Sequence, residues 1–206
     1  MLNSGAEIVI RADASSKIGI GHIMRCLALA DGLYSVGCCI TFVCRRHPGH
    51  LQALIESKQY RCYLLEQCTD LSPETPASFM EMQAQDAQEF IVILNGIGKK
   101  PAWVICDHYE LDRIWHEMVY EYTDRLMVID DLADRDYSCD ILLDPSYLRQ
   151  PKAYRDLVPE ECKLLTGTKF ALLRDEFFQA RLEINSFSRL PIKRPRILVT
   201  MGGRTQ

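Results

Sequence analysis

The chain has 206 residues, of which 48% are hydrophobic and 25% are charged, and its formal net charge is −4 at pH 7. These values are typical of a globular protein with a core of its own, and they exclude a disordered chain. The sequence pI of about 5.8 and the lack of a basic run argue against nucleic-acid binding. No apolar run approaches the roughly 18 residues that a membrane-spanning helix needs, and no signal peptide is evident. We therefore expect a cytoplasmic protein that binds neither nucleic acid nor membrane.

Nine cysteines are spread through the chain, and no two of them have the Cys-x-x-Cys spacing of zinc sites. Their number is odd, and several lie in apolar runs such as residues 38–44. We therefore expect free, largely buried thiols in a reducing compartment and no bound zinc.

Short apolar runs alternate with amphipathic stretches, which predicts strands that alternate with helices. Strands are expected at residues 7–13, 38–45, 60–65, 103–106, 126–129 and 141–143. Helices are expected at residues 22–36, 51–58, 77–94, 111–122 and 173–186, with a loop at 69–76. Strands that are apolar throughout are typical of a parallel sheet covered on both faces. We therefore predict one α/β domain over residues 1–190.

The end of the chain has a different pattern. Residues 191–196 are expected to form a linker, and residues 197–203 begin an apolar strand followed by a Gly-Gly turn. Because a strand and half a turn cannot form a domain, we expect residues 191–206 to be the start of a second domain that is missing. The apolar face that such a domain would cover predicts self-association.

Polar residues follow three of the predicted strands, at the sheet edge where parallel sheets bind ligands. The three groups are Asp13 with the loop as far as His22, Asp107-His108-Tyr109, and Asp130-Asp131. Such a cluster could bind a metal, but Asp after a strand is more often a cap or turn residue. The other histidines, His47, His50 and His116, are expected at the surface, apart from this cluster.

The loop at residues 15–22 reads Ser-Ser-Lys-Ile-Gly-Ile-Gly-His. Its two glycines let the backbone approach a ligand closely, and the following helix N-terminus favours an anion. A dinucleotide fingerprint would need a third small residue where Met24 stands. Arg45 and Arg46 could nevertheless suit the phosphate of NADP, so an NADP-binding domain remains an alternative.

His22 lies in the first turn of the predicted helix, where the helix dipole disfavours a charged imidazolium. A neutral imidazole can take a proton from water as a general base, although His22 could equally serve only as a cap for the loop. Arg25 is one turn further on and can project near His22. We expect Arg25 to contact a ligand or to pair with a carboxylate such as Asp13.

Six segments, in order along the chain, resemble one family, the UDP-2,4-diacetamido-2,4,6-trideoxy-β-L-altropyranose hydrolases of pseudaminic-acid synthesis. They are residues 11–25, 106–109, 129–131, 139–143, 170–177 and 201–203. The resemblance implies the N-terminal half of a GT-B-type architecture, in which two Rossmann-like domains face each other. It also implies a UDP-sugar substrate, release of UDP with inversion at C1, and neither metal nor cofactor.

The resemblance further implies that His22 activates the attacking water, and that Tyr109 and the loop at 15–21 line the sugar and diphosphate site. The predicted substrate-binding residues are Asp13, Ser15, Ser16, Gly19, Ile20, Gly21, Arg25, Asp107, His108, Tyr109, Asp131, Gly202 and Gly203. Two places depart from the family pattern: the segment Asp144-Pro145-Ser146, where a loop that carries Asn is expected, and Arg204, where an acidic residue is expected. Because a missing domain would hold the uridine, we expect its loss to limit activity. A glycosyltransferase of the same architecture and a non-catalytic remnant remain alternatives.

Overall fold

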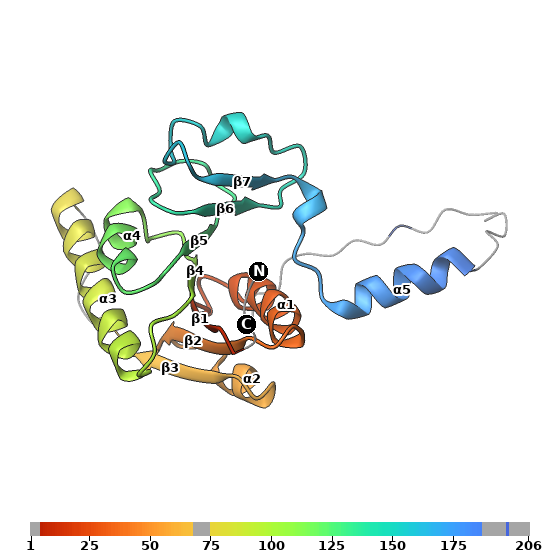
Figure 1. The fold of residues 1–206 in the computed structure, drawn as a ribbon, viewed down its shortest axis with the longest axis horizontal. Helices are drawn as coiled ribbons and strands as arrows, with labels where there is room; N and C mark the ends of the chain where they lie inside the picture. Colours follow the sequence, from red (N-terminus) through yellow and green to blue (C-terminus); the bar gives the residue numbers. More distant parts are fainter. Residues whose placement is uncertain (1–4, 68–74, 187–196, 198–206) are drawn as a thin grey trace.

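A computed structural model of the chain describes residues 5–67, 75–186 and 197, and shows one seven-stranded sheet in the order β3-β2-β1-β4-β5-β6-β7 (Figure 1). The strands are β1 (Glu7–Ala12), β2 (Cys39–Arg45), β3 (Arg61–Leu65), β4 (Trp103–Asp107), β5 (Leu126–Ile129), β6 (Ile141–Asp144) and β7 (Lys163–Thr166). Every neighbouring pair in this sheet is parallel. The predicted α/β class with a parallel sheet is confirmed.

Helices cover both faces of the sheet (Figure 1). They are α1 (Gly21–Ser35), α2 (Gln52–Ser57), α3 (Pro76–Gly96), α4 (Arg113–Tyr120) and α5 (Asp175–Ser186), with short 3-10 helices η1 (Pro151–Ala153) and η2 (Thr168–Phe170). Successive side chains of a strand point to opposite faces. Ile8 accordingly packs in the core beneath α1 and α2, whereas Val9 packs with Phe90 of α3 and Trp115 of α4.

Several boundaries differ from the sequence prediction. Residues 69–74 of the expected loop lie outside the described residues. Helix α3 begins at Pro76, one residue earlier than predicted, and Thr75 caps it by accepting a hydrogen bond from the Ser78 amide at 3.2 Å. Strand β7 was not predicted, since its four residues Lys-Leu-Leu-Thr are too short to show alternation. In α1 the side chain of Tyr34 is exposed.

Helix α5 extends away from the sheet (Figure 1). The linker, strand and turn predicted at 191–203 lie outside the described residues, apart from Ile197, and so do Gly202 and Gly203.

The eight cysteines in the described ranges are free, as expected, and five of them are buried. No helix in the described part of the chain is long and apolar enough to cross a membrane.

His116, which was expected at the surface, is fully buried in α4. Its ring stacks on Tyr137 with centroids 6.2 Å apart, and its Nε2 has no hydrogen-bond partner among the described residues. Burial, with a smaller contribution from Arg135, lowers the pKa of His116 to about 3. The imidazole is therefore neutral in the folded protein at every pH at which the protein is ordinarily handled.

We expect His116 to make folding sensitive to mild acid. In the unfolded chain the imidazole of His116 takes up a proton near pH 6.5, whereas in the folded chain it stays neutral until about pH 3. The free energy of unfolding therefore falls as the pH drops below about 6.5 and continues to fall towards pH 3. Between pH 7 and pH 5 the loss is about 2 kcal/mol. Urea unfolding at both pH values measures it, and His116→Phe, which cannot be protonated, should remove most of this difference. An equal loss in the variant would contradict the assignment.

Candidate active site

The carboxyl ends of β1, β4 and β5 bring five of the predicted residues into one group. His22 and Arg25 come from the first turns of α1, Asp107 and Tyr109 from the end of β4, and Asp131 from the loop after β5. These five residues are called the His22 cluster below. Their convergence follows from strand order, because β1, β4 and β5 are adjacent in the sheet.

His22 is held by a buried carboxylate. Its Nδ1 lies 2.6 Å from Oδ1 of Asp107, which is fully buried. A carboxylate can only accept, so Nδ1 carries the proton and donates it. The contact of the Arg25 Nη2 with the same Nδ1 at 3.2 Å cannot then be a hydrogen bond, since both atoms are donors. The lone pair of the neutral ring is therefore on Nε2, which makes no hydrogen bond to a described residue.

Arg25 pairs with carboxylates, which was one of its two expected roles, but its partners are the two carboxylates of the cluster and not Asp13, which was named as an example. Its Nε and Nη2 each donate to Asp107 at 2.5 Å, and its Nη1 donates to Asp131 at 3.0 Å. Burial alone would raise the pKa of Asp107, but hydrogen bonds from Arg25 and His22 outweigh it and hold that pKa below its ordinary value. Asp107 is thus a fixed anion that orients His22.

Tyr109 forms the solvent-facing side of the cluster, with 39% of its surface exposed. Its hydroxyl donates to Asp131 at 2.8 Å, and its ring meets that of His22 edge-on with centroids 4.5 Å apart. Burial, and then the carboxylate of Asp131, raise the pKa of Tyr109 to about 12. The phenol therefore stays protonated at neutral pH and can donate a hydrogen bond.

The loop before α1 is closed by its own hydrogen bonds. Ser15 is buried, and its Oγ accepts from the amides of Lys17 at 3.1 Å and Ile18 at 2.9 Å. Gly19 adopts a φ of 87°, which favours glycine, and its amide donates to the Ser15 carbonyl. The amide of Ser16 donates to the Pro48 carbonyl in the loop after β2. Ser15 and Gly19 therefore fix the shape of the loop before α1.

The first turn of α1 lacks a side-chain cap, because its N-cap residue is Ile20. The amides of Gly21, His22 and Ile23 stand at the positions of a helix that have no acceptor within the helix. Amides at this position and the helix dipole favour an anion, so the turn that carries His22 is suited to a phosphate group. Ser16 and Gly21 are exposed beside it.

Asp13 and His108 form a second group behind the first, with Arg11, Asp86 and His47; this group is called the Asp13 cluster. Asp13 is 1% exposed, and Arg11 donates to both of its oxygens, at 2.6 and 3.0 Å. Burial alone would raise the pKa of Asp13, but Arg11, His108 and His47 hold it well below its ordinary value. These contacts leave Asp13 in a supporting position.

Two residues, His47 of the Asp13 cluster and Arg45 beside it, bear on the sequence predictions. His47, which was expected apart from the strand-end residues, lies with Nε2 3.6 Å from Oδ2 of Asp13. Arg45, which was considered for an NADP phosphate, is buried and donates to Asp86 at 2.7 Å and pairs with Glu89 at 3.0 Å. Because Arg45 is already paired with these carboxylates, it is not free to bind the phosphate of NADP, which argues against the NADP-binding alternative.

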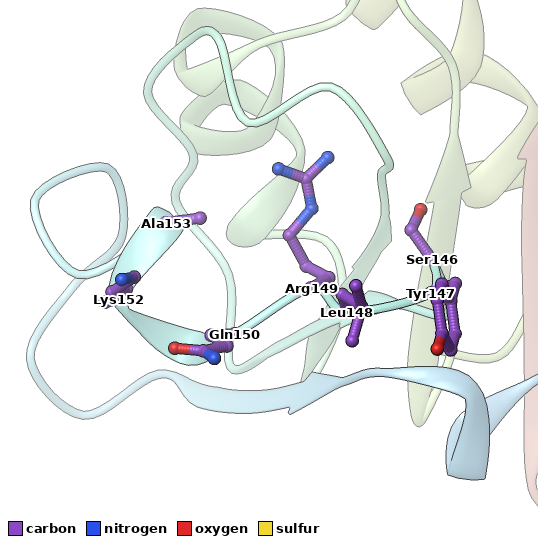
Figure 2. A pocket seen from close by; sticks show the side chains of 7 residues that line it. All are labelled: Ser146, Tyr147, Leu148, Arg149, Gln150, Lys152 and Ala153. Atoms are coloured by element: carbon purple, nitrogen blue, oxygen red, sulfur yellow. The ribbon is translucent and has the colours of Figure 1, made fainter.

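A shallow pocket of about 350 Å³ is lined by residues between Ser146 and Ala153, in the segment after β6. Figure 2 shows the guanidinium of Arg149 extending away from the side chain of Tyr147 within this loop. Arg149 donates to the Asp131 carbonyl at 2.6 Å and pairs with Asp144 at 2.5 Å. It therefore supports the loop that presents Asp131. Sequence reasoning missed this arginine; its only signal was the departure of nearby Asp144 from the expected Asn.

The two clusters contain many carboxylates and imidazoles but no site for a metal. Within the described ranges, no group of three or more His, Cys, Asp or Glu side chains is arranged to hold an ion. The carboxylates are paired with arginines or hydrogen-bonded to histidines instead. The site thus presents an imidazole with its Nε2 unbonded beside helix N-terminal amides, which favour an anion.

No protein-family model matches the chain. The UDP-2,4-diacetamido-2,4,6-trideoxy-beta-L-altropyranose hydrolase of Campylobacter jejuni is 28% identical over 177 residues, which are 86% of this chain and 55% of that protein. The chain thus spans about half the length of this curated relative, which carries the name of the family that the six segments resemble. The crystal structure of Acinetobacter baumannii MurG superposes with a TM-score of 0.53 at 13% identity, over 78% of this chain and 45% of that chain. This likeness concerns the fold alone, and together with the parallel sheet it identifies the described domain as a Rossmann-like half of the GT-B type.

Proposed function

We propose that this chain is the catalytic half of a hydrolase that releases UDP from UDP-2,4-diacetamido-2,4,6-trideoxy-β-L-altrose, a step of pseudaminic-acid synthesis in the cytoplasm. The observation that carries the proposal is the Asp107–His22 pair, with Nε2 of the imidazole free at the start of α1. The name of the Campylobacter jejuni relative supports the substrate.

The reaction that we infer is a single displacement. A water molecule gives a proton to Nε2 of His22 while its oxygen bonds to C1 of the sugar, and the bond from C1 to the phosphate oxygen breaks. The electron pair of that bond leaves with UDP. Because the water enters from the side opposite the leaving group, the configuration at C1 is inverted. UDP is a stable leaving group, so the reaction needs no metal. The first-turn amides of α1 are placed to stabilise its negative charge.

The substrate contacts that we propose are fewer than the sequence suggested. Tyr109 lies on the exposed side, where its hydroxyl oxygen can accept a hydrogen bond from the sugar, and Ser16, Ile20 and Gly21 border the anion position. Asp13, Ser15, Gly19, Arg25 and His108 support these groups from behind. Asp131 holds Tyr109 and Arg25, and its second role as a ligand for a sugar hydroxyl remains a prediction, as does self-association of the chain.

The test is UDP release from the named substrate, with EDTA present. It compares this chain with a fusion in which the chain is followed by the part of the Campylobacter jejuni relative that lies beyond the matched segment. We expect the fusion to release UDP without any added acceptor and EDTA to have no effect. Release only when an acceptor sugar is present would instead indicate a glycosyltransferase. No release by the fusion under either condition would overturn the proposal.

A further inference from the structure

We propose that His108 is a positioning residue that holds the turn at residues 107–110 against Asp13, and thereby sets the Asp107–His22 pair, without touching the substrate. The inference rests on the proposed function for its catalytic consequence, but its structural part can be tested separately. It replaces the expectation that His108 binds the substrate.

The two ring nitrogens of His108 are both in use. Nδ1 accepts a hydrogen bond from the Glu110 amide at 3.0 Å, and Nε2 lies 3.0 Å from Oδ2 of Asp13. An amide donates and a carboxylate accepts, so only the tautomer with the proton on Nε2 satisfies both contacts. The side chain is 9% exposed. His108 therefore has no free ring nitrogen for a ligand.

The carboxylate of Asp13, to which His108 donates, is itself held by several other hydrogen bonds. Asp13 receives two hydrogen bonds from Arg11 and one from the backbone amide of Arg45 at 2.6 Å. Arg11 is in turn fixed by Asp86 of α3, with contacts of 3.2 and 2.7 Å. The hydrogen bond to His108 thus ties the end of β4 to the ends of β1 and β2 through a buried anion.

The residues on either side of His108 in this turn both belong to the His22 cluster. Asp107 precedes it and orients His22, whereas Tyr109 follows it and meets the His22 ring edge-on. Release of the His108 ring would free this turn to shift relative to α1. A displacement of the order of 1 Å can lower a rate by about 10²-fold, because proton transfer depends steeply on geometry.

His47 provides a matched control. Its Nε2 approaches the same Asp13 oxygen, but at 3.6 Å, and it stands on the loop after β2 rather than on β4. Loss of either histidine removes one imidazole from Asp13. Only loss of His108 loosens the turn that carries Asp107.

The first arm of the test is NMR of the Nδ1–H proton of His22 in this chain, assigned by its disappearance in His22→Ala. We expect its exchange with water to accelerate by about tenfold or more in His108→Ala, the equivalent of one lost hydrogen bond. His108→Gln keeps a donor that can reach Asp13 and should restore much of the protection. His47→Ala should change the exchange rate by less than about twofold. Equal effects of the two alanine variants, or no effect of His108→Ala, would overturn the proposal.

The second arm is the kinetics of the UDP-releasing fusion. We expect His108→Ala to lower kcat by roughly 10–100-fold with KM nearly unchanged, and His108→Gln to recover part of the loss. A rise in KM at constant kcat would mark His108 as a substrate contact and overturn the proposal. If the parent fusion releases no UDP, the proposed function fails, whereas the NMR arm still decides the role of His108. Should His108→Ala not fold, His108→Leu, which fills the space but cannot donate to Asp13, takes its place in both arms and is compared with His47→Leu.

Discussion

Replacement of His22 by alanine is expected to lower kcat for UDP release by about 10²–10⁴-fold, the usual contribution of a general base. The reason is geometric, since His22 presents its Nε2 lone pair while Asp107 fixes its ring through Nδ1. Steady-state kinetics of the UDP-releasing fusion measure the loss. KM should change little, because Tyr109 and the first-turn amides of α1 remain in place.

His50→Ala is the matched control for this prediction, because His50 lies in the loop after β2 and contacts no member of the His22 cluster. Its rate should equal that of the parent. If His22→Ala kept most of the rate, the water would have to be activated by another group. Asp131 would then be the first to examine, since it is a partly exposed carboxylate of the same cluster.

The strand-end residues of the site could be predicted because the sheet is parallel. Asp107 and Asp131 follow apolar runs, and the carboxyl ends of neighbouring strands meet at one edge. The sequence could not say which arginine pairs with which carboxylate. Arg25 reaches Asp107 because β4 lies beside β1 in the sheet. The sequence pattern predicts the strands but does not say on which side of β1 the chain places β2 and β4.

Some of the contacts that were not predicted could have been inferred from the spacing of residues in the sequence. Arg11 and Asp13 are two residues apart on one chain segment, so they point the same way and can pair, as the structure shows. His116 lies beside Trp115 and three residues before Val119, on the face of α4 that packs on the sheet. The position of His47 against Asp13 carried no such signal, because it depends on the path of the loop after β2.

The largest expected loss of stability comes from Asp86→Ala. Asp86 is buried in α3 and accepts hydrogen bonds from Arg11, Arg45 and the Nε1 of Trp115. Burial alone would raise the pKa of Asp86, but the two arginines outweigh it and lower that pKa to about 2. Removing the carboxylate leaves two buried cations without this partner, and breaking a buried pair in this way typically costs about 3–5 kcal/mol.

Urea unfolding at pH 7 measures this loss as a change in the free energy of unfolding. Asp86→Asn keeps an acceptor in the same place and should be less harmful than alanine, which separates lost charge from lost hydrogen bonds. Glu117→Ala, which breaks the exposed pair of Glu117 with Arg113, should leave the free energy unchanged. Because Asp86 holds Arg11, and Arg11 holds Asp13, Asp86→Ala should also accelerate the exchange of the His22 Nδ1–H proton with water, although Asp86 is not a member of the His22 cluster. A loss below about 1 kcal/mol would show that solvent reaches the freed arginines, and that the Asp13 cluster is too open to act as a rigid anchor.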